Sequence, residues 1–300
     1  MVEEHRPRLS DAPDAVREMV ESLLGEPIVA EHPASAGFTP SIASEVAGAG
    51  GRRLFVKVGT DDAGLILAAV TGSLAPRLVG SGVVGEWRIA AYEVVEGEPV
   101  TRWHTADLPR LVPAVRRLAE LSPVRGSTPY AEAFVPMLGT WRALNGDGPR
   151  VDHLRGRRLP VDLPIPLLAD LESRWLDALA DGTALHHGDL RRDNFIRRPD
   201  GRLVIVDWTH LWTAPGWMDV VRLGPDVAAC GHDPEWLLRA CRPDAPADGV
   251  NVALAGLAGR AWRDGHLPGP TALRHMQREQ GLHTLRWLAA RLASTPTPRG

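Results

Sequence analysis

Three oxygen-bearing side chains fall within one short stretch of the sequence. Asp189 stands five residues before Asn194, and Asp207 follows Asn194 by thirteen residues. A carboxylate can accept or orient the proton of a hydroxyl group, and carboxylate and amide oxygens are ligands suited to Mg²⁺, a hard cation. Phosphoryl transfer to an alcohol needs a base near the hydroxyl, metal ligands, a cation on the phosphates and a loop that covers them. This stretch can supply the base, Asp189, and the metal ligands, Asn194 and Asp207.

The residues between Asn194 and Asp207 indicate strand, turn and strand. Residues 195–198 and 202–206 form the two strands, and the Pro-Asp-Gly sequence at 199–201 is turn chemistry. A hairpin brings its two ends together, so we expect Asn194 and Asp207 to lie side by side. The plain alternative is an ordinary hairpin flanked by solvated charges.

Lys57 is the only lysine among the 34 lysine and arginine residues. A GC-rich coding bias explains why lysines are rare, since Ala, Gly, Pro and Arg are all abundant. It does not explain the position of the one lysine that is present. Lys57 lies in a predicted strand, residues 54–58. A lone lysine on a strand is otherwise an ordinary surface residue.

The surrounding elements predict two lobes, a β-rich one of about 97 residues and a larger helical one. Hydrophobic periodicity, caps and turn residues indicate the elements. In the first lobe they are a helix at 8–25, strands at 42–46, 54–58, 78–79 and 87–95, and a short helix at 63–71. In the second lobe helical stripes cover 108–119, 167–179, 249–264 and 271–292, and 123–166 is mainly loop.

The stretch His-Gly-Asp-Leu-Arg-Arg-Asp-Asn at 187–194, followed by Val-Ile-Val-Asp-Trp at 204–208, resembles the signature of the aminoglycoside phosphotransferase / choline kinase family. Four other segments resemble that family's loop over the nucleotide phosphates, its lysine strand, its hinge and the segment after the metal aspartate: residues 36–43, 54–57, 92–97 and 215–219. The resemblance covers nearly the whole chain. It implies an α+β, bilobal protein-kinase-like fold, with a nucleotide-binding lobe at 1–97, a hinge at about 92–97 and a helical lobe at 98–300.

The resemblance also implies a role for each matching residue. Asp189 accepts or orients the substrate hydroxyl, Asn194 and Asp207 hold Mg²⁺, and Lys57 pairs with the phosphates of ATP or GTP. Loop residues Gly37, Phe38 and Thr39 cover the phosphates, and backbone groups of Glu93 and Val95 meet the base. The resemblance gives structural roles, in support of the loop that carries Asp189, to His187, Asp193 and Asp219.

The sequence departs from the family pattern at two places. The loop at 36–43 has one glycine, Gly37, and is not the Gly-rich sequence of protein kinases. Kinases pair the strand lysine with a Glu on the next helix, yet residues 58–85 contain only Asp61 and Asp62 as acids. Either of these aspartates substitutes for that Glu, or the ion pair is absent and nucleotide alone holds Lys57.

Net charge and composition narrow the possible binding partners of the protein and its cellular compartment. A net charge of −3 and a pI of about 6.4 give no basic excess for nucleic acid or an anionic membrane. No apolar stretch reaches membrane-spanning length, and two cysteines without a CxxC pattern fit a reducing cytoplasm. We expect a cytoplasmic monomer or homodimer that binds a nucleotide and a small hydroxyl compound.

The acceptor is the open question. Residues 211–300 hold ten arginines against eight acids, which is not the acidic surface expected for polycationic aminoglycosides. Trp208, Trp212 and Trp217, with His210, are candidates for walls of the acceptor pocket, although tryptophans are often core. The leading hypothesis is phosphorylation of an antibiotic of aminoglycoside, nucleoside or peptide type, conferring resistance. Alternatives are a metabolic kinase for choline, a sugar or an amino alcohol, and a nucleotide-binding pseudokinase.

Overall fold

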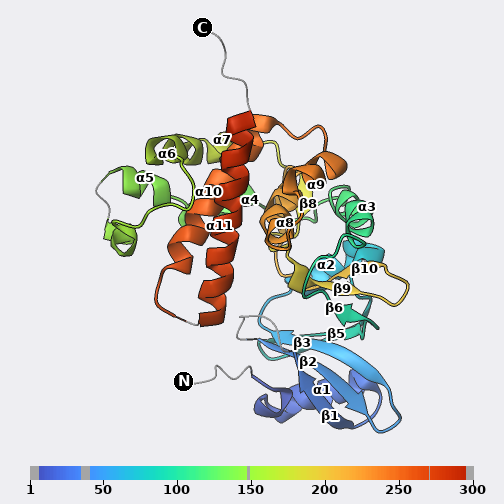
Figure 1. The fold of residues 1–300 in the computed structure, drawn as a ribbon. Coiled ribbons are helices and arrows are strands. Elements are labelled where there is room, and N and C mark those ends of the chain that lie inside the picture. Colours follow the sequence, from blue (N-terminus) through green and yellow to red (C-terminus); the bar gives the residue numbers. More distant parts are fainter. Residues whose placement is uncertain (1–6, 35–40, 147–148, 270, 295–300) are drawn as a thin grey trace. The chain divides into compact units, whose positions relative to one another are not determined.

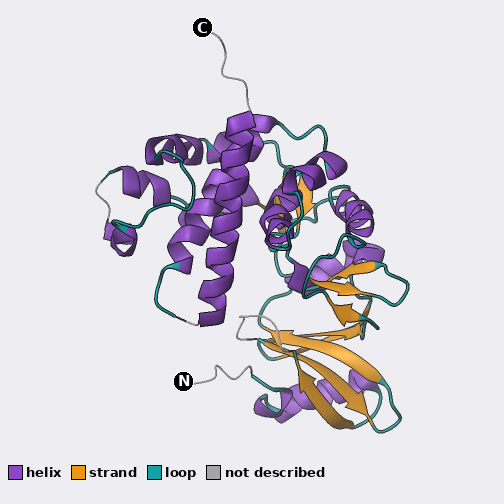
Figure 2. Ribbon diagram, in the orientation of Figure 1, coloured by secondary structure: helices purple, strands orange, loops and turns teal. Residues whose placement is uncertain are grey.

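The computed structural model describes residues 7–34, 41–146, 149–269 and 271–294. The chain divides into two compact units. Unit 1 comprises Met1–Val100 and Asp193–His210, and unit 2 comprises Thr101–Arg192 and Leu211–Gly300. The strands concentrate in unit 1 and the helices in unit 2 (Figure 2). The expected α+β class is therefore confirmed, while the expected division at residue 97 stays a prediction.

Unit 1 is built on a five-stranded antiparallel sheet in the order β1-β2-β3-β5-β4 (Figure 1). The strands are β1 Ile28–Pro33, β2 Ile42–Gly48, β3 Arg53–Gly59, β4 Leu78–Val84 and β5 Trp87–Glu93. Helix α1, Asp14–Leu24, packs Val16, Val20 and Leu24 into the core of this sheet. The sequence suggests one helix from residue 8, but Pro13 limits α1 to a start at Asp14, after a 3₁₀ turn at Leu9–Asp11.

Alternation along β3 decides which way Lys57 points. Leu54, Val56 and Val58 are buried in the core against α1, so the residues between them face the other side of the sheet. Lys57 is one of these, opposite Ala43 of β2 and Ala90 of β5. Small alanine side chains on both neighbouring strands leave room for the lysine stem. Helix α2, Ala63–Thr71, follows β3 directly.

A second, smaller sheet completes unit 1. Its order is β10-β9-β6, with β6 Glu98–Pro99, β9 Phe195–Arg197 and β10 Leu203–Ile205. Strand β9 pairs with β10 on one side and with β6 on the other. The predicted hairpin at 194–207 is thus tied to the residues that follow the first sheet in sequence.

Unit 2 is mainly helical. The described helices include α3 Leu108–Leu118, α4 Tyr130–Ala133, α5 Thr140–Asn145, α6 Ile165–Ser173, α7 Trp175–Leu179, α8 Met218–Ala229, α9 Pro234–Cys241, α10 Ala247–Gly265 and α11 Thr271–Ser294. The stripe expected at 167–179 is two helices, α6 and α7, separated at Arg174. A short sheet of β7 Thr128–Pro129, β11 Trp212–Ala214 and β8 Ala184–His186 lies among the helices.

Helix α8 packs closely against α11. A Cβ added at Gly224 of α8 would lie 2.2 Å from the Trp287 ring of α11, so glycine is required for this approach. Helices α10 and α11 run side by side (Figure 1), and α10 is buried along most of its length. Within the described ranges, no helix is both long enough and apolar enough to cross a membrane.

Candidate active site

Asn194 and Asp207 lie at the base of the hairpin in unit 1. Strands β9 and β10 pair in antiparallel register, Ile205 with Phe195, and the turn between them is closed by Gly201 at φ +80°. Beyond the paired residues, the Val206 N–H donates to the Asn194 carbonyl at 2.9 Å. This bond holds the backbone of Asn194 beside the residue that precedes Asp207. The expectation that the hairpin brings these two segments together agrees with this pairing.

Lys57 and Asp207, which are 150 residues apart in sequence, form an ion pair in unit 1. Lys57 Nζ lies 2.5 Å from Asp207 Oδ1. Asp207 also has a φ of +62°, and it is the one non-glycine residue with positive φ in the described part of the chain. Positive φ is uncommon for residues other than glycine, although Asp tolerates it better than most, and such backbone conformations cluster at functional sites where the surrounding structure enforces them.

Asp61 and Asp62 have other partners than Lys57. Asp62 pairs with Arg88 of β5 at 3.2 Å, and Asp61 accepts the Ala63 N–H at the start of α2. Among the described residues neither aspartate supplies the ion pair that a helix Glu gives in protein kinases. The acidic partner of Lys57 in this structure is Asp207.

The segment that carries Asp189 is held by Asp219 in unit 2. We call residues 187–192, which follow β8, the Asp189 segment. Asp219, in the first turn of α8, accepts the N–H of His187 at 3.1 Å and of Gly188 at 3.3 Å, and its Oδ1 lies 3.0 Å from His186 Nδ1. Burial alone would raise the pKa of Asp219, but His186, His187 and these N–H bonds hold it below its usual value of 3.8. Asp219 therefore stays ionised while buried.

The carboxylate of Asp189 lies between two guanidinium groups. Arg222 Nη2 of α8 lies 3.1 Å from Asp189 Oδ1, and Arg191 Nη2 lies 3.5 Å from Oδ2. Burial opposes ionisation of Asp189, yet Arg191, Arg222 and His187 lower its pKa below 3.8. The Asp189 N–H donates to His187 Nδ1 at 3.3 Å, so the His187 side chain supports the backbone at Asp189. Asp189 is an anion with little tendency to keep a proton.

Asp226, two turns along α8 from Asp219, holds the other end of the Asp189 segment. It accepts the Arg192 N–H and the Trp103 indole N–H, each at 2.8 Å, and pairs with the Arg192 side chain at 3.0 Å. Arg192 also pairs with Glu279 of α11. Sequence reasoning missed Arg222 and Asp226. The available signal was the spacing of Asp219, Arg222 and Asp226, which places all three on one face of a helix.

The remaining predicted site residues other than tryptophan lie in unit 1 or outside the described residues. Gly37, Phe38 and Thr39 lie outside the described residues. Glu93 ends β5 with its N–H bonded to the Arg77 carbonyl, and Val95 lies just after the strand. Asp193 and His210 fall in unit 1.

The three predicted pocket tryptophans are packed to different degrees. Trp208, in unit 1, is 8% exposed and its indole N–H bonds the Ile205 carbonyl. Trp217, in unit 2, is 5% exposed. Trp212 of β11 is less buried and its ring centroid lies 5.2 Å from that of Tyr130. For Trp208 and Trp217 this burial matches the alternative, left open by the sequence, that these tryptophans belong to the core.

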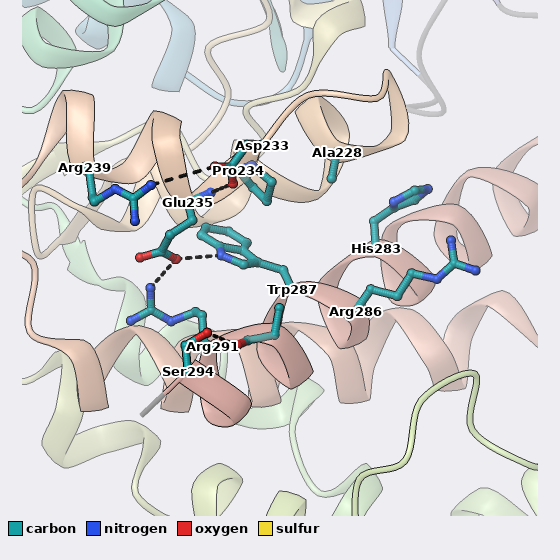
Figure 3. Close-up of a pocket in the computed structure, with 11 residues that line it drawn as sticks. Ala228, Asp233, Pro234, Glu235, Arg239, His283, Arg286, Trp287, Arg291 and Ser294 are labelled. Carbon is teal, nitrogen blue, oxygen red and sulfur yellow. Dashed lines mark hydrogen bonds and ion pairs between the residues drawn. The ribbon is translucent and has the colours of Figure 1, made fainter. Parts of the chain in front are cut away.

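A pocket of about 480 Å³ in unit 2 is lined by none of the predicted site residues (Figure 3). Its walls come from the end of α8, from α9 with the residue before it, and from α11. Glu235 accepts the Trp287 indole N–H at 2.9 Å and pairs with Arg291, while Arg286 and His283 line the wall formed by α11. Charges in this pocket are largely matched within it.

Comparisons with known proteins bear on the family and the fold of this chain. Residues 61–266 match the phosphotransferase enzyme family. Three solved structures share the fold. They are an aminoglycoside phosphotransferase from Alicyclobacillus acidocaldarius (14% identity, TM-score 0.58, 89% of this chain and 92% of that one), the choline kinase LicA from Streptococcus pneumoniae (14%, 0.56, 94% and 99%), and aminoglycoside phosphotransferase APH(4)-Ia (12%, 0.59, 95% and 99%). The kinase-like fold expected from the sequence is thereby confirmed.

Proposed function

This chain belongs to the phosphotransferase enzyme family, and we propose that it transfers the γ-phosphate of ATP or GTP to a hydroxyl group of a small molecule. The observation that carries the proposal is the Lys57–Asp207 pair. It joins the predicted phosphate cation to the predicted metal ligand across 150 residues of sequence. The alternative of an ordinary hairpin gives no reason for a partly buried lysine of β3 to contact the carboxylate at the end of that hairpin.

Asp189 is proposed to orient the acceptor hydroxyl. A carboxylate with a lowered pKa is a weak base, so it accepts a hydrogen bond from the alcohol more readily than it removes the proton outright. As the alcohol oxygen bonds to the γ-phosphorus, the bond from that phosphorus to the departing nucleoside diphosphate breaks. The alcohol proton becomes more acidic during this step and passes to the Asp189 carboxylate. Orientation of this kind requires a rigid segment, and the bonds from Asp219 and Asp226 to residues 187, 188 and 192 provide it.

Asn194 and Asp207 are proposed to hold Mg²⁺. The donor set fits the ion, because one amide oxygen and one carboxylate are hard ligands and Mg²⁺ takes one or two carboxylates together with nucleotide phosphates. Asp207 contacts the Lys57 ammonium group, and a carboxylate that already faces a cation supports the proposal. When bound, the ion would neutralise charge on the phosphates.

The acceptor is proposed to be an antibiotic or a related metabolite. A structure of APH(4)-Ia was solved as a ternary complex with ADP and hygromycin B (12% identity, TM-score 0.57), and LicA is a choline kinase. Hygromycin B and choline are the substrates of those proteins. For this chain the two structures support a nucleotide donor and a small hydroxyl compound as acceptor. The cytoplasmic location expected from the sequence stays part of this proposal.

The test is a phosphorylation screen. The protein is incubated with ATP or GTP and MgCl₂ against aminoglycosides, nucleoside and peptide antibiotics, choline and sugars, and products are identified by the mass gain of one phosphoryl group. Asp207→Asn should abolish transfer, whereas Asp200→Asn, in the turn of the same hairpin, should not. Transfer that persists in Asp207→Asn would refute the assignment of Asp207.

A further inference from the structure

The pocket of about 480 Å³ in unit 2 lies among three helices (Figure 3). Its walls come from the end of α8, from α9 with the residue before it, and from α11. The volume falls in the range of small-molecule sites, about 300–1,000 Å³. None of the described residues proposed for phosphoryl transfer lines this pocket. A ligand bound here would therefore occupy a second site.

The Trp287 ring ties the α11 wall to the other two helices. On α8, a Cβ added at Gly224 would lie 2.2 Å from this ring, so the ring packs directly on the helix backbone. On α9, Glu235 accepts the Trp287 indole N–H at 2.9 Å. Only 4% of the Trp287 surface is exposed. These contacts hold the walls in place, and preformed walls are typical of small-molecule sites.

Both acids that line the pocket have partners. Glu235 pairs with Arg291 at 2.5 Å. Asp233 accepts the Glu235 N–H at 2.8 Å and lies 3.8 Å from Arg239. Neither carboxylate pairs with the third arginine of the pocket wall, Arg286.

Arg286 is an exposed cation on the α11 wall. In the part of the chain that the structure describes, it forms no hydrogen bond and no ion pair. On α11 the positions three and four residues to either side of it hold no acid, which removes the usual helical partners. The acid two turns before it, Glu279, pairs with Arg192 at 3.0 Å. No described acid of α11 or of the pocket walls therefore pairs with the charge of Arg286.

His283, one turn before Arg286, lines the same end of the pocket. Figure 3 shows both side chains on one side of the Trp287 ring, with the ion pair between α9 and α11 on the other. Burial lowers the pKa of His283 below its usual 6.5, Glu279 opposes this, and Arg286 lowers the pKa further. The imidazole is therefore neutral at neutral pH and offers a hydrogen-bond donor without adding charge. This end of the pocket combines a cation with a neutral donor.

We propose that this pocket binds a small organic anion, whose carboxylate or phosphate group is held by Arg286 and whose apolar part lies against Trp287 and Pro234. A guanidinium fork matches the oxygens of both anionic groups in two-point fashion. The apolar part of the wall comes from Ala228, Pro234, Trp287 and Ala290, which suits a ligand with a ring or a short hydrocarbon body. The inference goes beyond the proposed phosphotransferase function and does not depend on it.

The test uses three compounds that share a phenyl ring, since benzoate and phenyl phosphate are anions and benzylamine is a cation. Binding of each to the full chain is measured by isothermal titration calorimetry. We expect benzoate and phenyl phosphate to bind with dissociation constants of about 1 mM or tighter, the range for compounds of this size, and benzylamine not to bind. Inorganic phosphate, which lacks the ring, should bind more weakly than phenyl phosphate. Either anion satisfies the proposal, and the tighter of the two identifies the charged group.

Two substitutions in the pocket test the assignment. Arg286→Gln should weaken benzoate binding by about tenfold or more, the scale of one hydrogen bond to a charged group. Ala290→Trp fills the pocket with a ring while keeping its charges, so it should weaken benzoate binding as well. The matched control is Arg110→Gln on α3, because Arg110 is likewise exposed and has no ion pair among the described residues. It should bind benzoate as the parent chain does.

Three results would overturn the inference. They are an absence of saturable binding of both benzoate and phenyl phosphate up to about 10 mM, binding of benzylamine as tight as that of benzoate, and equal affinities for benzoate in Arg286→Gln and Arg110→Gln. The thermal midpoints of these two variants are compared first, and equal values show that both are folded.

The Asp207→Asn variant separates this inference from the proposed function. Benzoate should bind to this variant as it binds to the parent chain, so a failure of the phosphotransferase assignment leaves the inference standing. Loss of benzoate binding in Asp207→Asn would place the anion in the proposed phosphotransfer site and overturn the inference.

Discussion

Asp219 and Asp226 stand seven residues apart on α8, and each accepts backbone N–H groups of the segment that carries Asp189. Seven residues are two helical turns, so both carboxylates leave the same face of the helix. Arg222 lies between them on that face and contacts Asp189 itself. One buried helix thus holds the start, the centre and the end of the Asp189 segment. The position of the proposed catalytic carboxylate is set by α8.

Removal of Asp226 should therefore destabilise unit 2 and lower turnover. In Asp226→Ala the Trp103 indole and the Arg192 N–H lose their acceptor. A buried donor that loses its acceptor costs about 1–3 kcal/mol, so for these two donors we expect the free energy of unfolding to fall by about 2–6 kcal/mol in urea titrations. Asp226→Asn keeps one acceptor oxygen and should recover part of the loss and part of kcat at a temperature where both variants are folded.

The matched control for this experiment is Asp244→Ala, which removes a surface aspartate paired with Arg242. Exposed ion pairs contribute about 0–1 kcal/mol, so this variant should unfold nearly as the parent does. An Asp226→Ala protein as stable and active as the Asp244→Ala protein would show that α8 does not hold the segment through Asp226.

Lys57 can be examined chemically, because it is the only lysine in the chain. An amine-reactive acylating reagent has two primary targets, the Lys57 ammonium group and the chain's own α-amino group, and peptide mapping separates them. We expect ATP or GTP with MgCl₂ to slow acylation of Lys57, by about tenfold at a nucleotide concentration ten times the dissociation constant. The α-amino group is the internal control. Equal protection of both amines, or of neither, would contradict phosphate binding by Lys57.

Acid should destabilise the protein in part through Asp219. Its pKa is lower in the folded chain than its usual value of 3.8, so the unfolded state binds a proton first as pH falls. A carboxylate of this kind contributes stability that is full above the unfolded pKa and is lost as pH falls through the folded value. The stability difference between the parent and Asp219→Asn should therefore shrink below about pH 4 in urea unfolding series. A difference that stays constant from pH 6 to pH 3 would argue against an ionised Asp219.

The hairpin and the lysine strand could be predicted because their signals are local. A Pro-Asp-Gly turn between two apolar strands fixes the hairpin without reference to the rest of the chain. The alternation of Leu54, Val56 and Val58 likewise places Lys57 on the opposite face of its strand. Family resemblance then supplied the pairing of distant segments that local pattern alone does not give.

The role of α8 could not be predicted in the same way. The spacing of Asp219, Arg222 and Asp226 also fits the solvated face of an ordinary amphipathic helix. Whether Asp226 is buried depends on Trp103, which is 123 residues away in sequence. The partner of Lys57 was missed for a related reason, since Asp61 and Asp62 are near in sequence but are used by Arg88 and the Ala63 backbone.

The most direct measurement of the central claim is nucleotide turnover in the presence of an acceptor that the parent chain phosphorylates. This turnover is compared between the parent chain and Asp189→Asn. Asparagine keeps the size of the side chain and removes the charge that Arg191 and Arg222 contact. A positioned acid–base group contributes about 10²–10⁴-fold to rate, so kcat should fall by that range while nucleotide binding persists. A kcat within a few-fold of the parent value would contradict the assignment of Asp189 and, with it, this account of phosphoryl transfer.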